Sequence, residues 1–215
     1  MSVDHLFNIK RNQLKMIKNR GYNIDAEEWI LDDNLTSHMF IKKLISIYGE
    51  TAPNQYRNLL TSIYKHDENK KIIVSFVGIA EFSNKQISID SIEKIIESMI
   101  TNDTDCLIII NATLSSAANN RLNCITESKI QILNEDELLF NLIDHIFVPK
   151  YELLTKEEAA KLTSSLTFNK KVYPILLSSD PIYRYYNYNS GDIIKIYEEY
   201  NLLLSGQEYS YRIAA

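Results

Sequence analysis

The fold class of this chain is decided by the segment Asp90-Ser-Ile-Glu-Lys-Ile-Ile-Glu-Ser-Met-Ile-Thr-Asn-Asp-Thr-Asp-Cys-Leu-Ile-Ile-Ile110. Its first half carries apolar side chains at helical spacing, which predicts a helix with one buried face. These side chains are Ile92, Ile95, Ile96, Met99 and Ile100. Asp90 and Glu93 have the spacing of a capping box, so the helix is expected to start directly after Asp90. The run Leu107–Ile110 is apolar without alternation, which predicts a strand covered on both faces.

Other segments of the first two thirds of the chain extend this pattern. Strands are predicted at Lys71–Val77 and Lys129–Leu133, and a polar loop at Asn111–Ser116 leads into a short helix. Strand, helix, strand, loop, helix, strand is the order of an α/β domain with a partly parallel sheet. Two further helices are predicted ahead of it, at about residues 5–20 and 37–48, each followed by a glycine that can end it.

The pattern changes near Phe147, after which shorter elements follow one another. Thr155-Lys-Glu-Glu158 predicts a capping box that opens a helix through Leu166. Asp180-Pro181 predicts the N-cap and first residue of another helix. Two short strands are predicted at 192–197 and 209–213.

The 215 residues are enough for a larger and a smaller domain, each with its own core. From the change of pattern we expect an α/β N-terminal domain with a mixed sheet at residues 1–145. A small α+β C-terminal domain is expected at residues 146–215.

Composition excludes several classes of protein. No run approaches the roughly 20 apolar residues that span a bilayer, and the basic N-terminus lacks the apolar centre of a signal peptide, so we expect a soluble protein that stays where it is made. Cys106 and Cys124 stand alone, which excludes a disulfide framework and a zinc ribbon. The net charge of −5 leaves no basic surface over a whole domain, so any contact with nucleic acid must be local.

Catalytic motifs are missing from the sequence. The four histidines are scattered, and no phosphate-binding glycine loop or nucleophile elbow is present. The acidic clusters Asp32-Asp33 and Glu135-Asp136-Glu137 could hold a hard cation, but they are more typical of a solvated face or a helix start. We therefore predict no catalytic residue, no cofactor and no metal site. The alternative is a stand-alone metal-dependent nuclease with an α/β core.

Tyrosines gather in the last part of the chain. Tyrosine buries a large ring and keeps a polar tip, a profile typical of a protein–protein contact surface. The alternative is that the rings fill a small core. The residues are Tyr173, Tyr183, Tyr185, Tyr186, Tyr188, Tyr197, Tyr200, Tyr209 and Tyr211.

The C-terminal part resembles a known family through a series of motifs. They are Val148-Pro149, Leu154-Thr-Lys-Glu-Glu-Ala159, Tyr173-Pro-Ile175, Ser179-Asp-Pro-Ile-Tyr-Arg-Tyr-Tyr186 and Gly191-Asp-Ile-Ile-Lys-Ile196. In order and spacing they resemble the fifth subunit of eukaryotic DNA-directed RNA polymerases, whose C-terminal part is similar to a small subunit of archaeal RNA polymerases. Leu6-Phe-Asn-Ile9, Asn19-Arg-Gly-Tyr22 and Ile89–Arg121 resemble the family's N-terminal half, so the resemblance covers essentially the whole chain.

The resemblance implies a non-catalytic subunit of a multisubunit RNA polymerase, without cofactor or metal of its own. The C-terminal assembly domain would dock on the largest subunit, and the N-terminal jaw domain would form part of the lower jaw beside downstream DNA. The implied docking residues are Asp180, Pro181, Arg184, Tyr185 and Tyr186. Asp180 and Pro181 also have a structural role as a helix start, and packing within the domain is an alternative role for Arg184.

The resemblance also places the loop and helix that follow Leu107–Ile110 near the DNA duplex. The implied DNA-proximal residues are Ser115, Ser116, Asn119 and Arg121. Ser115 and Ser116 would lie at the start of a helix, where backbone N–H groups and hydroxyls can meet a phosphate. Arg121 is the charged member of the set, and the alternative is that it pairs with a neighbouring carboxylate.

Some positions depart from the family pattern. Tyr151 replaces a histidine, Ser179 replaces a glycine, and Asn187 stands at a turn where the family has glycine. Residues 197–206 replace the family's Arg-Pro-Ser-Glu-Thr-Ala-Gly signature. The replacement favours a divergent source, such as a large DNA virus with its own polymerase. We then expect the protein in the virion or a cytoplasmic viral factory, and in the nucleus if the source is cellular.

Overall fold

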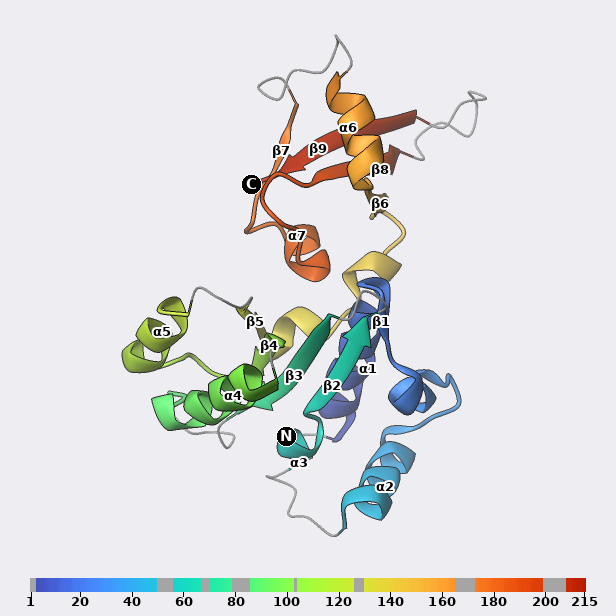
Figure 1. The fold of residues 1–215 in the computed structure, drawn as a ribbon. Helices are drawn as coiled ribbons and strands as arrows, with labels where there is room; N and C mark the ends of the chain where they lie inside the picture. Colours follow the sequence, from blue (N-terminus) through green and yellow to red (C-terminus); the bar gives the residue numbers. More distant parts are fainter. Residues whose placement is uncertain are drawn as a thin grey trace. The chain divides into compact units, whose positions relative to one another are not determined.

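The computed structural model describes residues 3–49, 56–66, 70–78, 86–102, 104–125, 130–164, 173–198 and 208–215. The chain divides into two compact units, residues 1–140 (unit 1) and 141–215 (unit 2) (Figure 1). The division falls after Phe140, ahead of the predicted position after His145. Each unit combines helices with a mixed sheet, which makes this a mixed α/β protein.

Unit 1 is built on a sheet in which neighbours along the chain are neighbours in space, in the order β1-β2-β3-β4-β5. The first three strands pair antiparallel and the last three pair parallel, so the sheet is partly parallel as predicted. Helices α4 and α5 make the crossovers that parallel pairing requires. The strands are β1 (Tyr22–Asn23), β2 (Ser62–His66), β3 (Lys71–Val77), β4 (Asp105–Ile110) and β5 (Ile130–Asn134).

The other elements of unit 1 surround this sheet. The two predicted N-terminal helices are confirmed, and each is followed by a glycine with positive φ, Gly21 at +86° and Gly49 at +84°. The positive φ favours glycine at position 21, and a Cβ there would lie 2.7 Å from His66 Nε2, so the His66 ring would have to move. The helices are α1 (Val3–Asn19), η1 (Asp25–Leu31), α2 (Ser37–Tyr48), α3 (Tyr56–Leu59), α4 (Ile89–Asn102), α5 (Ser116–Asn123) and η3 (Glu135–Leu138).

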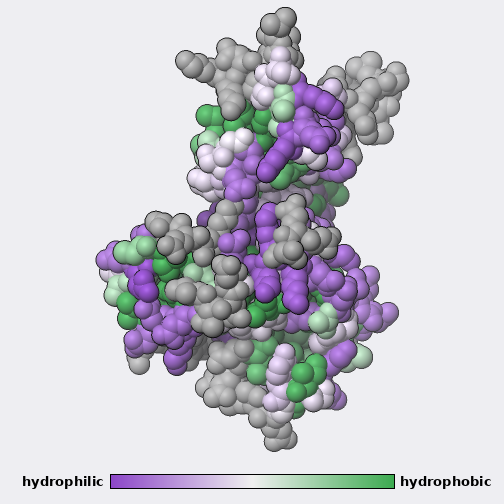
Figure 2. All heavy atoms as spheres, viewed as in Figure 1, coloured by the Kyte–Doolittle hydropathy of each residue, from purple (hydrophilic) through white to green (hydrophobic). Residues whose placement is uncertain are grey.

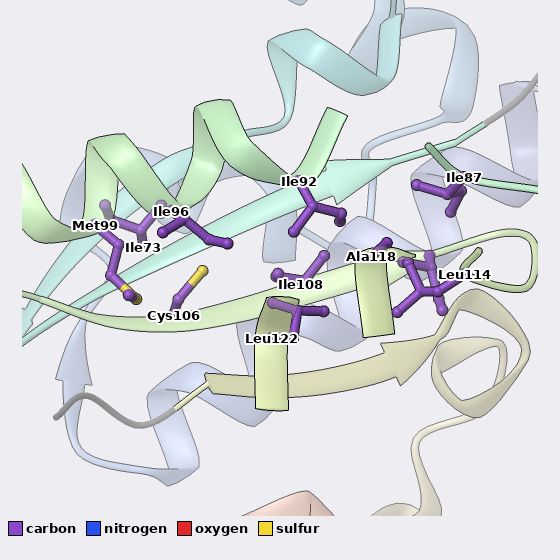
Figure 3. Close-up of a cluster of buried hydrophobic side chains, with 11 residues drawn as sticks. Ile73, Ile87, Ile92, Ile96, Met99, Cys106, Ile108, Leu114, Ala118 and Leu122 are labelled. Carbon is purple, nitrogen blue, oxygen red and sulfur yellow. The ribbon is translucent and has the colours of Figure 1, made fainter. Parts of the chain in front are cut away.

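The core under α4 confirms the central sequence pattern (Figure 3). Ile92, Ile96 and Met99 of α4 point at the sheet and pack with the strand residues Ile73 and Ile108. Cys106, Ile87, Leu114, Ala118 and Leu122 complete this cluster. Burial raises the pKa of the Cys106 thiol to about 12, so this cysteine behaves as a small apolar side chain.

The start of α4 differs from the prediction. The helix begins at Ile89, so Asp90 lies in the first turn and the predicted capping box with Glu93 is wrong. The buried Ile87 fixes the chain just ahead of the helix: its N–H donates to Thr113 O, and its own carbonyl accepts from Ser115 N–H, each at 3.0 Å. These hydrogen bonds fix Ile87 two residues ahead of the first residue of α4, and the Glu93 carboxylate pairs with Arg121 instead of capping the helix.

Unit 2 has its own sheet, in the order β6-β8-β9-β7, with β7 parallel to β9 and the other pairs antiparallel. Its core contains aliphatic and tyrosine side chains, including Leu176, Ile182, Tyr188, Ile194 and Ile196. The elements are η4 (Leu142–Asp144), β6 (Lys150–Leu153), α6 (Lys156–Ser164), β7 (Ile175–Leu176), α7 (Pro181–Tyr186), β8 (Ile193–Glu198) and β9 (Glu208–Ala214).

Two local predictions in unit 2 are confirmed by the structure. Thr155 N–H donates to Glu158 Oε2 at 2.9 Å and Glu158 N–H donates to Thr155 Oγ1 at 3.3 Å, which is the predicted capping box. Asn187 adopts the left-handed conformation with φ of 54°, as its place at a turn requires. Helix α6 is described to Ser164, and Leu166, the predicted end, lies outside the described residues.

Within the described ranges, no helix is long and apolar enough to cross a bilayer.

Candidate functional site

The predicted docking residues lie on and just before α7 in unit 2. Asp180 Oδ1 accepts a hydrogen bond from Ile182 N–H at 2.8 Å, and Pro181 occupies the first helical position. Asp180 is therefore an N-cap, and the exposed ring of Pro181 lies beside it. Arg184, one turn further on, is half-buried.

The tyrosines of α7 mostly pack inward. Tyr185 is only 7% exposed, and Tyr186 stacks on Tyr188 with ring centroids 5.3 Å apart and an angle of 20° between the planes. Tyr183 meets Tyr188 edge to face at 6.2 Å. Burial raises the pKa of Tyr188 and, to a smaller extent, that of Tyr186. In this part of unit 2 the rings fill a small core, which is the alternative interpretation of the tyrosine cluster.

Other tyrosines lie on β8 and β9 of the same sheet. Lys195 Nζ lies 4.7 Å from the Tyr197 ring centroid and 4.3 Å from that of Tyr209, which is 53% exposed. These distances place the cation against both rings. A side-chain hydrogen bond with Tyr197 raises the pKa of Lys195. Tyr211 meets Tyr209 edge to face at 5.6 Å. Tyr200 lies outside the described residues, as do most of residues 197–206.

A shallow cavity of about 300 Å³ lies beside the Asp180 cap. Its wall includes Leu177, Ile175 and Arg212. Ile175 and Leu177 are exposed, and Figure 2 shows apolar spheres on the surface of unit 2 around β7. At this edge of the unit 2 sheet, apolar and charged side chains therefore line one cavity.

The predicted DNA-proximal residues run from the N-cap of α5 in unit 1 to the last turn of this helix. Ser115 is the N-cap, and its hydroxyl accepts from Ala118 N–H at 3.3 Å. Ser116 and Asn119 are exposed. Arg121 Nε donates to both carboxylate oxygens of Glu93 at 3.1 Å, so the charged member of the set has a partner within the chain, as the alternative interpretation proposes.

The acidic clusters considered as cation sites are engaged in other contacts. Glu135 is buried and accepts from Arg57 Nε at 2.7 Å and from Arg57 Nη2 at 2.9 Å. Asp33 is exposed and forms an ion pair with Arg11. No group of three histidine, cysteine, aspartate or glutamate side chains suited to a metal ion occurs among the residues that the structure describes.

A buried polar network in unit 1 was not anticipated from the sequence. Lys10 is 1% exposed, and its Nζ lies 2.9 Å from Glu27 Oε2, 2.9 Å from the Tyr64 hydroxyl and 3.1 Å from Leu60 O. Tyr64 and Ser62 also donate hydrogen bonds to Glu27. The one sequence signal is the place of Lys10 between Phe7 and Leu14 on the apolar face of α1.

The charges in this network depend on one another. Burial lowers the pKa of Lys10, while Glu27 acts in the opposite direction. Burial alone would raise the pKa of Glu27, but Lys10 and the hydroxyls of Ser62 and Tyr64 hold it below its ordinary value. The network borders a cavity of about 750 Å³ between η1 and β2.

The chain is similar to known subunits of DNA-directed RNA polymerases. Residues 140–214 match the family described as RNA polymerase Rpb5, C-terminal domain. The chain is 26% identical over 189 residues to DNA-directed RNA polymerase V subunit 5A of Arabidopsis thaliana, covering 87% of this chain and 78% of that protein. It is 24% identical over 205 residues to DNA-directed RNA polymerases I, II, and III subunit rpabc1 of Dictyostelium discoideum, covering 90% of each. These matches confirm the resemblance that the sequence motifs indicate.

Proposed function

We propose that this chain is a non-catalytic subunit of a multisubunit RNA polymerase. Residues 140–214 match the RNA polymerase Rpb5 C-terminal domain. The chain is also similar over most of its length to fifth subunits of DNA-directed RNA polymerases. The observation that carries this proposal is the coverage. Both units are included in the similarity to the Dictyostelium discoideum subunit, which extends over 90% of each chain.

Within the polymerase, unit 2 is the assembly domain that docks on the largest subunit. Its support is that the family match falls on residues 140–214, which is nearly the extent of unit 2. The exposed apolar side chains beside the Asp180 cap give unit 2 a surface that another protein can cover.

Unit 1 is the jaw domain beside downstream DNA. The exposed Ser116 and Asn119 of α5 offer neutral donors to a phosphate. With Arg121 paired to Glu93, this contact is weak and sequence-independent, and it operates inside the assembled polymerase rather than in the free chain.

The replaced segment 197–206 supports a divergent source. We place the protein with a virus-encoded polymerase, in the virion or a cytoplasmic viral factory. A cellular source would place it in the nucleus.

Co-purification tests the proposed function. A tagged full-length chain, expressed in the organism that encodes it, is expected to bring down the largest polymerase subunit at a fixed ratio of one to one. A tagged chain that purifies without polymerase subunits overturns the proposal. The purified chain alone, incubated with DNA and divalent metal, distinguishes the nuclease alternative, since we expect it to leave DNA uncut.

A further inference from the structure

A tight turn at the start of unit 2 presents two large apolar side chains to solvent. Val148 N–H donates to His145 O at 2.9 Å, which closes a β-turn with Ile146 and Phe147 at its tip. Ile146 is 87% exposed and Phe147 is 74% exposed. Of the large hydrophobic side chains described in unit 2, these two are the most exposed.

This composition is unusual for a turn. Turn tips favour glycine, proline, asparagine, aspartate and serine, because these residues suit the backbone of a turn and cost little free energy when they are exposed to water. Neither Ile146 nor Phe147 has a positive φ, so any of several polar residues would fit this turn without strain. Local structure therefore does not explain why the tip is apolar.

The turn is held on both sides by the core of unit 2. Leu142 and Ile143 precede it and Val148 closes it, and all three pack against the buried cluster around Ile194. At the tip, Phe147 N–H donates to His145 Nδ1 at 3.3 Å, and the two rings lie 5.5 Å apart. The turn is thus preorganised, so a partner that covers it has little conformational entropy to remove.

We propose that Ile146 and Phe147 are the apolar anchor through which unit 2 docks, inserting as a pair into an apolar pocket of the largest polymerase subunit. This inference rests on the proposed function and names the residues that carry it out. The turn lies inside the residues that match the polymerase family, and Tyr185 of α7, an implied docking residue, is only 7% exposed. A projecting pair with one aliphatic and one aromatic side chain has the chemistry of a binding hot spot that fills a concave apolar site.

The test compares full-length tagged chains that differ at the turn. The double variant Ile146→Glu/Phe147→Asn keeps residues that suit the turn but removes its apolar tip. Ile146→Leu/Phe147→Leu keeps the tip apolar. Ile63→Glu changes an exposed isoleucine of unit 1 and serves as the matched control. For each chain, the largest subunit retained is measured after washes of increasing stringency, and the melting temperature of the free chain is recorded.

We expect the polar double variant to lose at least about thirtyfold in affinity for the largest subunit. The leucine variant and Ile63→Glu should retain it, and all four chains should melt at similar temperatures. Equal retention by the polar double variant overturns the inference while the proposed function stands. A melting temperature well below that of the unaltered chain also overturns it, because the side chains would then be covered within the chain. Failure of the unaltered chain to retain the largest subunit rejects the proposed function itself.

Discussion

The two units of this chain build their hydrophobic cores from different kinds of side chain. Unit 1 buries aliphatic stripes, with Ile92 and Ile96 of α4 against Ile108 of β4, and adds buried ion pairs such as Lys10–Glu27. Unit 2 is smaller and uses tyrosines such as Tyr186 and Tyr188 for part of its core, where each ring fills a large volume and keeps a polar tip. A tyrosine-rich segment is therefore evidence for a small domain as much as for a contact surface.

The first prediction separates the two units by function and has the largest expected effect. Residues 141–215 expressed alone should fold and bind the largest polymerase subunit, because the core of unit 2 and the turn at Ile146 lie within them. Residues 1–140 should show little binding in the same pull-down. Full binding by the fragment 1–140 would show that docking belongs to unit 1 and would contradict this prediction.

The second prediction concerns the Lys10–Glu27 ion pair of unit 1. Lys10→Met removes the cation and leaves the largely buried Glu27 carboxylate without it, so the free energy of unfolding should fall by about 3–5 kcal/mol. Lys18→Met on the same helix is the matched control, because Lys18 pairs with Glu28 on the surface and its loss should cost less than about 1 kcal/mol. Denaturant unfolding of the full chain measures both, and equal losses would contradict a special role for Lys10.

The same pair predicts a pH dependence. The pKa of Glu27 is lowered in the folded chain from an ordinary value of 4.5, so its stabilisation is present above that pH and is lost as the pH falls through the lowered value. Unfolding measured from neutral to acidic pH should therefore show a smaller acid-dependent loss for Lys10→Met than for the unaltered chain.

The third prediction tests the start of α7 in unit 2. Asp180→Ala removes the acceptor for Ile182 N–H and should lower stability by about 0.5–2 kcal/mol. Glu157→Ala, an exposed change in α6, is the control. An unchanged thermal midpoint for Asp180→Ala would show that the cap is dispensable.

The fourth prediction has the smallest effect and concerns DNA. Arg121→Ala should shorten the lifetime of stalled polymerase complexes modestly and equally on different sequences, and should flatten the salt dependence by at most about one unit of slope. Glu93→Gln, which weakens the ion pair with Arg121, should act in the opposite direction. Identical lifetimes for unaltered and Arg121→Ala polymerase at every salt concentration would show that Arg121 makes only its ion pair with Glu93 and does not contact DNA.

The sequence predicts unit 1 better than it predicts the candidate sites. The stripe on α4 and the apolar run of β4 specify a helix on a parallel sheet, because periodicity over several turns has one good solution. Helix α7 has only six residues, too few to tell its buried face from its exposed face, and Tyr185 proves to be buried. Lys10 was missed because a lysine in an amphipathic helix is normally solvated, and its partner Glu27 comes from a different element.

The exposed turn illustrates a further limit of sequence reasoning. Ile146 and Phe147 stand next to Val148 in one apolar run, and only the hydrogen bond that closes the turn shows that the first two project while the third is partly buried. Which side chains face a partner depends on this local backbone geometry.

The central claim is that this chain is a polymerase subunit anchored through unit 2, and a cryo-electron microscopy structure of the polymerase purified from the organism that encodes it tests this most directly. We predict one copy of the chain per polymerase, with Ile146 and Phe147 of unit 2 against the largest subunit and unit 1 beside the downstream duplex. A polymerase that lacks the chain, or holds it through unit 1 with the Ile146–Phe147 turn in solvent, would contradict the account.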